Sequence, residues 1–105
     1  RRNGMYVSRL AFATLPGRTH EAESKLRQLR DLVAEAGGRQ PRVFRTHFAS
    51  PNAPDLVFEQ EATDLAALEQ EIGTVTGDPR FQALSREISG LLAATPKREV
   101  YRLVE

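Results

Sequence analysis

Hydrophobic residues alternate with polar ones along MYVSRLAFAT, residues 5–14, and this period of two predicts a β-strand. Its apolar face consists of Tyr6, Leu10 and Phe12. From Thr19 the spacing changes to alternating steps of four and three, which predicts an amphipathic helix with Thr19 as its N-cap. The apolar stripe of this helix is Ala22, Leu26, Leu29, Val33 and Ala36. Gly37 and Gly38 end it, because glycine readily adopts the left-handed conformation found after helix C-termini.

The second half of the chain predicts a hairpin, two helical segments and a last strand. Strands are expected at 42–49 and 55–62, joined by the turn-forming sequence SPNAP, so the two strands pair antiparallel. Thr63 or Asp64 can cap a helix, which breaks at TGDP, where Asp78 and Pro79 begin a second segment. The apolar stripes of the two segments are Leu65, Leu68, Ile72 and Val75, then Phe81, Leu84, Ile88 and Leu91. A short strand over residues 98–104 follows.

The order β α β β α β, with the second helix bent, predicts an α+β protein with the ferredoxin-like fold. In this topology four strands form an antiparallel sheet with both helices on one face. The chain has 105 residues and no internal linker, so residues 5–105 are expected to form one domain. Residues 1–4, RRNG, precede the first strand pattern and are interpreted as an upstream extension or an expression remnant.

Alternation also predicts which strand residues the helices leave uncovered, if the helices take the more apolar face. The helix-covered face is then Tyr6, Leu10, Phe12, Phe44, Thr46, Phe48, Leu56, Phe58, Ala62, Tyr101 and Leu103. The uncovered face is Val7, Arg9, Ala11, Ala13, Val43, Arg45, His47, Ala49, Val57, Glu59, Glu61, Val100, Arg102 and Val104. Valines mixed with charges of both signs fit neither a fully wet nor a fully dry surface. This predicts a homodimer that packs through its sheet faces and encloses a cavity.

Charged residues interrupt the predicted hairpin at period two. If the hairpin is symmetric about Asn52, Arg45 faces Glu59, His47 faces Val57, and Glu61 lies opposite Val43. Two interpretations stay open: the charges neutralise each other inside an interface, or they bind a ligand beside His47, whose side chain can transfer protons near neutral pH. The candidate ligand-binding residues are Arg9, Arg45, His47, Glu59 and Arg102, with His47 the candidate catalytic residue.

The composition limits the classes of partner, compartment and metal or cofactor site that the sequence predicts. Fifteen Lys and Arg against fourteen Asp and Glu give a net charge of +1, so neither nucleic acid nor an anionic membrane is expected as a partner. The chain has no cysteine and no long apolar run, and the cytoplasm is the expected compartment. His20, Glu21 and Glu23 are neighbours in sequence but point in different directions on a helix, so no metal site is expected. No cofactor motif occurs.

A resemblance to known proteins lies in four segments: MYVSRLAFATLPGRTHEAESKLRQL, PNAPDLVFEQEATDLAALEQ, GDPRFQAL and REVYRLV. Through them the chain resembles the dimeric α/β-barrel superfamily, and within it the NIPSNAP-like and small stress-responsive proteins. The similar elements span nearly the whole chain from Met5. The resemblance implies a homodimer whose two sheets form a barrel-like body, with a cleft between each sheet and its helices or partner. Members of the superfamily include cofactor-independent monooxygenases of polyketide-like aromatics, haem-degrading enzymes, and dismutases or isomerases of small acids. The Asn, Trp and Arg grouping of those oxygenases has no counterpart here, since Trp is absent and the two Asn residues, Asn3 and Asn52, lie outside the predicted strands.

The sequence therefore predicts a small homodimeric domain that binds a small organic ligand in a cavity on the uncovered sheet face. An alternative is a cofactor-independent monooxygenase or isomerase of a small aromatic or polyketide-like substrate, with His47 as proton shuttle and Arg45 or Arg9 stabilising an enolate. A third possibility is an interaction protein that pairs an edge strand with a partner. The residues identify neither the ligand nor the reaction, and a pocket of roughly 300 Å³ or more with His47 at its wall would favour the enzyme.

Overall fold

The computed structural model describes residues 5–104; residues 1–4, predicted to be an extension, and residue 105 lie outside the described part. Seven elements follow in the order β1 (Tyr6–Phe12), α1 (Thr19–Glu35), β2 (Arg39–Arg45), β3 (Leu56–Ala62), α2 (Leu65–Thr76), α3 (Pro79–Ser89) and β4 (Lys97–Arg102). The predicted order of elements is confirmed, including the bend that divides the second helical region into α2 and α3. None of the described helices has the length and hydrophobicity needed to span a bilayer.

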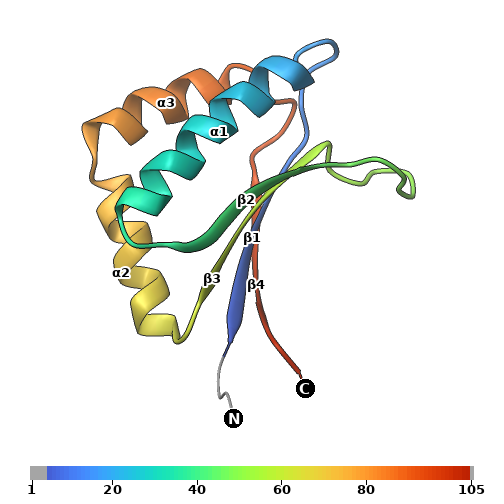
Figure 1. The fold of residues 1–105 in the computed structure, drawn as a ribbon. Helices are drawn as coiled ribbons and strands as arrows, with labels where there is room; N and C mark the ends of the chain where they lie inside the picture. Colours follow the sequence, from blue (N-terminus) through green and yellow to red (C-terminus); the bar gives the residue numbers. More distant parts are fainter. Residues whose placement is uncertain (1–4, 105) are drawn as a thin grey trace.

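The four strands form one antiparallel sheet in the order β2-β3-β1-β4. The three helices of residues 5–104 lie on one face of this sheet, and within this range no helix covers the other face (Figure 1). The predicted ferredoxin-like α+β fold is thus confirmed. The Cα trace measures 44 × 35 × 18 Å, so the molecule is a flat slab of two layers.

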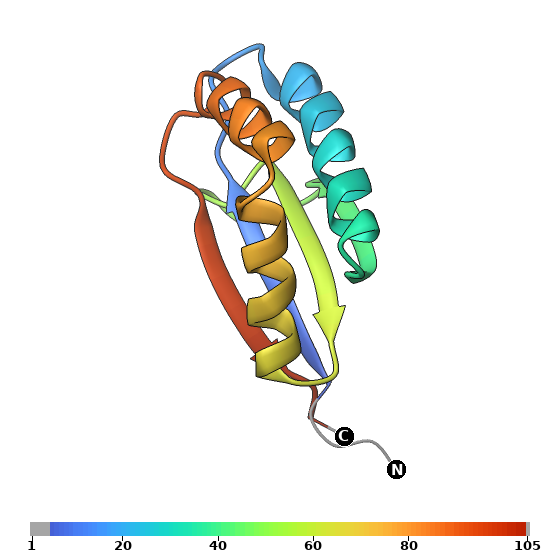
Figure 2. The same cartoon turned by 90° about the vertical axis from the view of Figure 1, so that its left-hand side faces the viewer.

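The core lies between the sheet and the helices. It is built from the predicted stripes of the three helices and from one face of β1 and β3: Phe12, Ala22, Leu26, Leu29, Val33, Leu56, Phe58, Val75, Leu84, Ile88 and Leu91. β4 lies at the edge of the sheet beyond α2 and α3, and every residue of β4 is exposed (Figure 2). The helix-side layer therefore covers β1 and β3 well and leaves the β4 edge uncovered.

Helix ends follow local chemistry, with one correction. Asp64 caps α2 by accepting a hydrogen bond from the Ala67 amide (2.7 Å), which decides between Thr63 and Asp64. Asp78 caps α3 as predicted, with Pro79 as the first helical residue. The prediction that Thr19 caps α1 is wrong: Arg18 holds the N-cap position without a side-chain cap, and Thr19 is already helical.

The glycine pair that ends α1 meets two separate requirements. Gly37 has φ +93°, a left-handed conformation that glycine adopts without strain. At Gly38 an added Cβ would lie 2.4 Å from Cγ1 of Val33, so the close approach of the chain to the helix requires glycine there.

The hairpin register differs from the symmetric one expected. Arg42 pairs with Glu59 and Arg45 with Leu56, so the hairpin is centred between Ser50 and Pro51, not at Asn52. The partner of each β2 residue moves by three positions along β3. Because side chains alternate between the two faces, an odd shift exchanges the faces to which the β2 side chains point. The predicted facing of Arg45 and Glu59 is therefore wrong, as are the pairs of His47 with Val57 and of Val43 with Glu61.

The side chains of β4 also point to the faces opposite to those predicted. Tyr101 pairs with Val7 and Glu99 with Arg9, which places Tyr101 on the face without helices. Val100 and Arg102 consequently face the helix side. The predicted faces hold for β1 and β3, whose neighbours in the core fix their orientation.

Candidate functional site

We call the sheet face without helices the open face. By strand pairing its residues are Val7, Arg9, Ala11, Arg42, Phe44, Val57, Glu59, Glu61, Lys97, Glu99 and Tyr101. Two aromatic residues that the sequence reasoning had placed in the core, Phe44 and Tyr101, are each 46% exposed there. The open face is therefore more apolar than predicted, since it gains two aromatic rings in exchange for Val43 and Val100.

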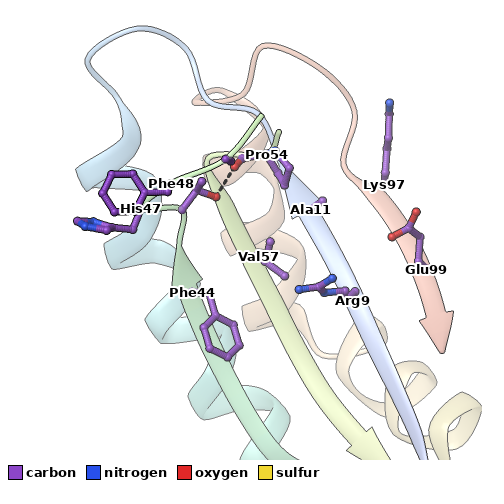
Figure 3. Close-up of a pocket in the computed structure, with 11 residues that line it drawn as sticks. Arg9, Ala11, Phe44, His47, Phe48, Pro54, Val57, Lys97 and Glu99 are labelled. Carbon is purple, nitrogen blue, oxygen red and sulfur yellow. Dashed lines mark hydrogen bonds between the residues drawn. The ribbon is translucent and has the colours of Figure 1, made fainter. Parts of the chain in front are cut away.

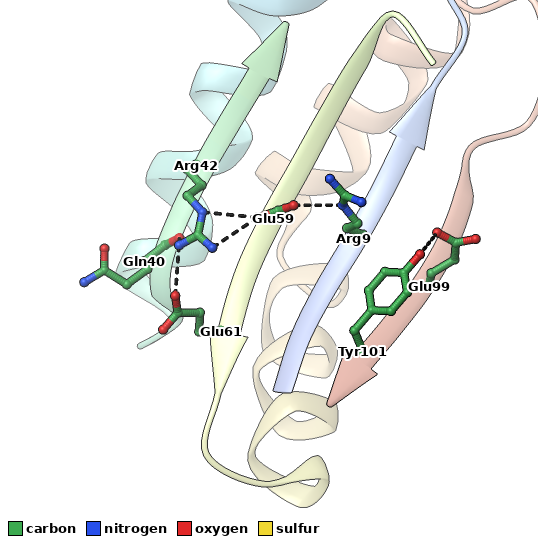
Figure 4. A network of polar contacts seen from close by, with 7 residues as sticks. All are labelled: Arg9, Gln40, Arg42, Glu59, Glu61, Glu99 and Tyr101. Carbon is green, nitrogen blue, oxygen red and sulfur yellow. Dashed lines mark hydrogen bonds and ion pairs between the residues drawn. The ribbon is translucent and has the colours of Figure 1, made fainter. Parts of the chain in front are cut away.

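A polar network crosses three strands at the centre of the open face (Figure 4). The side chain of Glu59 is only 11% exposed, and its carboxylate accepts hydrogen bonds from Arg9 Nε (2.8 Å) and from Arg42 Nη2 (3.1 Å) and Nε (3.2 Å). Arg42 Nη1 also donates to Glu61 (3.1 Å) and to the backbone oxygen of Gln40 (3.2 Å). Two guanidinium groups and two carboxylates thus form a neutral cluster.

The aromatic rings extend this network. The Arg9 guanidinium lies 5.9 Å from the ring centroid of Tyr101, and the Arg42 guanidinium lies at the same distance from Phe44. The Tyr101 hydroxyl donates to Glu99, which raises the pKa of Tyr101. Burial on its own lowers the pKa of Arg42, but the hydrogen bonds to Glu61 and Glu59 outweigh it and leave this pKa raised.

A cavity of about 500 Å³ lies at one end of the open face (Figure 3). One wall is the β2–β3 connection, residues 46–55, which we call the arm. The lining residues are Arg9, Ala11, Phe44, Thr46, His47, Phe48, Ala49, Pro54, Val57, Lys97 and Glu99. The cavity thus combines apolar and aromatic side chains with two cations and one carboxylate, a composition typical of small-molecule sites.

Backbone hydrogen bonds fix the base of the arm to the sheet. The Thr46 amide donates to the Asp55 oxygen (3.0 Å), and the Asp55 amide donates to the oxygen of Phe12 (2.9 Å). The Asp55 carboxylate accepts from the Thr14 amide (2.8 Å). The arm is therefore anchored at its base, while Phe48 near its tip is 90% exposed.

The predicted site residues divide into two groups. Arg9 and Glu59 form a direct ion pair, and Arg9 and His47 line the same cavity. His47 lies at the rim in Figure 3, with its ring 4.5 Å from that of Phe48 in an edge-to-face contact. Arg45 and Arg102 are not part of this site. Arg45 points to the helix side and forms an ion pair with Glu23 of α1 (3.0 Å). Arg102 is the last residue of β4, where its backbone pairs with Tyr6 of β1, and its side chain faces the helix side.

Sequence reasoning missed five charged or aromatic residues of the open face: Arg42, Phe44, Lys97, Glu99 and Tyr101. Their alternation was visible, but its phase depended on the register of two edge strands. A β-bulge between Arg39 and Arg42, with Gln40 at φ +49°, adds one residue to β2. Gln40 precedes Pro41, the one sequence signal of irregular backbone at this point. Within residues 5–104 no group of three or more acidic or histidine side chains is placed to hold a metal ion.

Comparison with solved structures shows that the fold is shared with several bacterial proteins. A NIPSNAP family protein from Agrobacterium tumefaciens superposes with a TM-score of 0.83 at 16% identity, covering 100% of this chain and 90% of that one. A candidate antibiotic biosynthesis monooxygenase from Nitrosomonas europaea gives 0.73 at 12% identity, covering 99% and 95%. A dimeric protein with a ferredoxin-like fold from Bacteroides fragilis gives 0.70 at 11% identity, covering 98% and 100%.

No protein-family profile matches the sequence, and no curated protein is similar to it. The expected resemblance to NIPSNAP-like proteins is confirmed for the fold. At these identities the likeness defines the class of protein by its architecture alone.

Proposed function

We propose that this chain forms a homodimer through its open face and binds a small organic ligand in the cavity beneath the arm. The observation that carries the proposal is the combination of Phe44 and Tyr101, half-exposed, with a neutral charge network between them. Such a face gains from burying its rings, and its paired charges do not repel a second copy.

The large solvent-accessible area of the chain supports the proposed dimer. The chain exposes 6711 Å², whereas a compact monomer of 11.7 kDa is expected to expose about 5,900 Å². A standard interface buries about 800 Å² of each partner, which is of the same order as this excess. The protein from Bacteroides fragilis with the same fold is described as dimeric, which agrees with the proposal.

Light scattering coupled to size exclusion tests the dimer. Phe44→Glu introduces an unpaired charge on the open face and is expected to give a monomer. Leu65→Glu is the matched control, because Leu65 is 49% exposed on α2, on the opposite side of the sheet, and its substitution should leave the dimer intact. A dimer that survives Phe44→Glu would place the interface elsewhere.

The cavity lining indicates the ligand: Phe44 and Phe48 suit a planar apolar body, and Lys97 suits an acidic group. Among residues 5–104 no ion pair includes Lys97, whereas Arg9 is held by Glu59. 2-Naphthoate is a suitable probe, and its NMR titration should shift the amide signals of Phe44, Phe48 and Lys97. His47→Ala should remove this binding; unchanged affinity would exclude His47.

A catalytic role is the second candidate, favoured by the size of the cavity and by His47 on its wall. In a cofactor-independent oxygenation, His47 would take a proton from an enolisable aromatic substrate, and Arg9 or Lys97 would stabilise the enolate. Dioxygen is the oxidant: a methylene group of the substrate becomes a carbonyl, so one oxygen atom enters the product and the other leaves as water with the two hydrogens of that methylene. Dioxygen uptake with anthrone as probe, measured for the wild type and His47→Ala, tests this role, and equal rates for the two proteins would exclude it.

A further inference from the structure

A second concave region lies on the helix side of the sheet, lined in part by Arg98 of β4. Figure 2 shows β4 at the sheet edge beside α2 and α3. A small cavity of about 60 Å³ and a groove of about 370 Å³ adjoin each other there. Both are lined by Leu10, Leu29, Phe81 and Arg98, and we call the combined region the Arg98 groove. The sheet separates it from the open-face cavity, so the two sites are independent.

Arg98 is the cation of this groove. Its Nη1 donates to the hydroxyl of Ser8 (2.6 Å), a β1 residue that is 2% exposed in the core layer. No ion pair within residues 5–104 includes Arg98, in contrast to Arg9, Arg42 and Arg45, which all meet glutamates. Although Arg98 is exposed as a residue, the side chains of the groove partly desolvate its guanidinium and lower the pKa of Arg98. A guanidinium without a counter-charge beside an apolar groove offers charge-assisted hydrogen bonds to an anion.

The remaining lining is apolar with few polar groups. Phe81 and Leu10 form its walls, Ser85 and Ser89 of α3 form its outer rim, and Gln60 contributes one buried amide. One cation suits a group with a single negative charge, since a phosphate dianion normally meets several donors or cations. The volume of the groove lies within the range of small-ligand pockets, which begins at about 300 Å³.

We propose that the Arg98 groove binds a small amphipathic monocarboxylate, with the carboxylate on the Arg98 guanidinium and the apolar body between Leu10 and Phe81. The guanidinium can donate to the carboxylate through its free N–H groups while Nη1 keeps its bond to Ser8. The apolar body is held by burial of its surface, which requires no directional contacts.

Octanoate is the probe, with octanol and octylamine as matched ligands of the same chain length. In an NMR titration of the full chain, octanoate is expected to shift the amide signals of Leu10, Phe81 and Arg98 and to bind at least about tenfold more tightly than octanol, as a charge-assisted bond predicts. Octylamine should not bind. Equal affinity for octanoate and octanol, or shifts confined to Phe44 and Lys97 on the open face, would overturn the proposal.

Three variants assign the effect to the groove. Arg98→Gln retains a donor for Ser8 and should lower the affinity for octanoate at least about tenfold. Arg86→Gln removes an exposed arginine of α3 outside the groove and should leave this affinity unchanged. Ser89→Trp fills the outer groove and leaves the Arg98–Ser8 contact in place. It should therefore also lower the affinity for octanoate, while its free energy of unfolding stays that of the wild type. Undiminished binding by Ser89→Trp or Arg98→Gln would overturn the proposal.

Discussion

Glu59 occupies the centre of the open face because β3 has neighbours on both sides, and each neighbour contributes an arginine. Its carboxylate is nearly buried and accepts from both guanidinium groups. A carboxylate in this position costs solvation energy, and the two ion pairs offset it. The residue therefore joins β1, β2 and β3 through side chains in addition to their backbone ladder.

Glu59→Gln should lower the free energy of unfolding by about 1–3 kcal/mol, because two partly buried arginines lose the charge that they share. Urea denaturation measures the change. Glu69→Gln is the control, since Glu69 is exposed on α2, and its substitution should change stability by less than about 0.5 kcal/mol. Equal effects of the two substitutions would mean that the network contributes little to folding.

The pair between Glu23 and Arg45 gives the stability a pH dependence. The hydrogen bond that Arg45 donates to the Glu23 carboxylate lowers the pKa of Glu23 below the ordinary value of 4.5. A carboxyl with a lowered folded pKa stabilises the fold above pH 4.5, and this contribution is lost as the pH falls through the folded pKa. The melting temperature of Glu23→Gln should therefore lie below that of the wild type at pH 7 and approach it towards pH 3. A difference that stays constant across this range would contradict the prediction.

At the scale of elements, the helices show how much the sequence could predict. Periodicity located α1, α2 and α3 because their stripes pack against a single core, and the strong breaks at Gly37 and Pro79 fixed their ends. β1 and β3 were assigned to the correct faces for the same reason: the helix side of β3 is fully buried, and β1 contributes the buried Phe12 to the core.

The edge strands could not be predicted with the same certainty, because each has one strand neighbour and little burial. Phe44 and Val43 are both apolar, so alternation alone allows either to face the core, and the bulge at Gln40 and the length of the arm decide the phase. The same ambiguity affects Tyr101 and Val100 in β4. The errors at the candidate site therefore follow from register, and the residue types that the site needs were present in the expected strands.

The N-cap of α2 offers a test of element stability. Asp64→Ala removes the bond to the Ala67 amide and should cost about 1 kcal/mol, because the amide at the helix start loses its acceptor. Thr63→Ala is the matched control and should change stability far less, since Asp64 holds the cap position. Chemical denaturation compares them. A larger loss for Thr63→Ala would mean that the helix begins one residue earlier.

Gln40 tests the cost of the bulge. Its φ of +49° is unfavourable for a residue with a Cβ and is further restricted by Pro41. Gln40→Gly should raise the free energy of unfolding by up to about 1 kcal/mol. Asn52→Gly is the comparison, because Asn tolerates its φ of +71° and should gain less. Destabilisation by Gln40→Gly would mean that the Gln40 side chain stabilises the bulge.

At the scale of the whole molecule, the proposed dimer makes stability depend on protein concentration. Folding coupled to association gains about 1.4 kcal/mol per mole of dimer for each tenfold rise in concentration, so the midpoint of thermal unfolding should rise with concentration. The Phe44→Glu chain should unfold at a lower temperature that is the same at every concentration, because its open face no longer pairs. Leu65→Glu should keep the wild-type dependence, which separates the open face from the helix side. A midpoint independent of concentration in the wild type, across a range that spans the dissociation constant found by light scattering, would leave Phe44 and Tyr101 as exposed residues of a monomer and would remove the reason for a second copy.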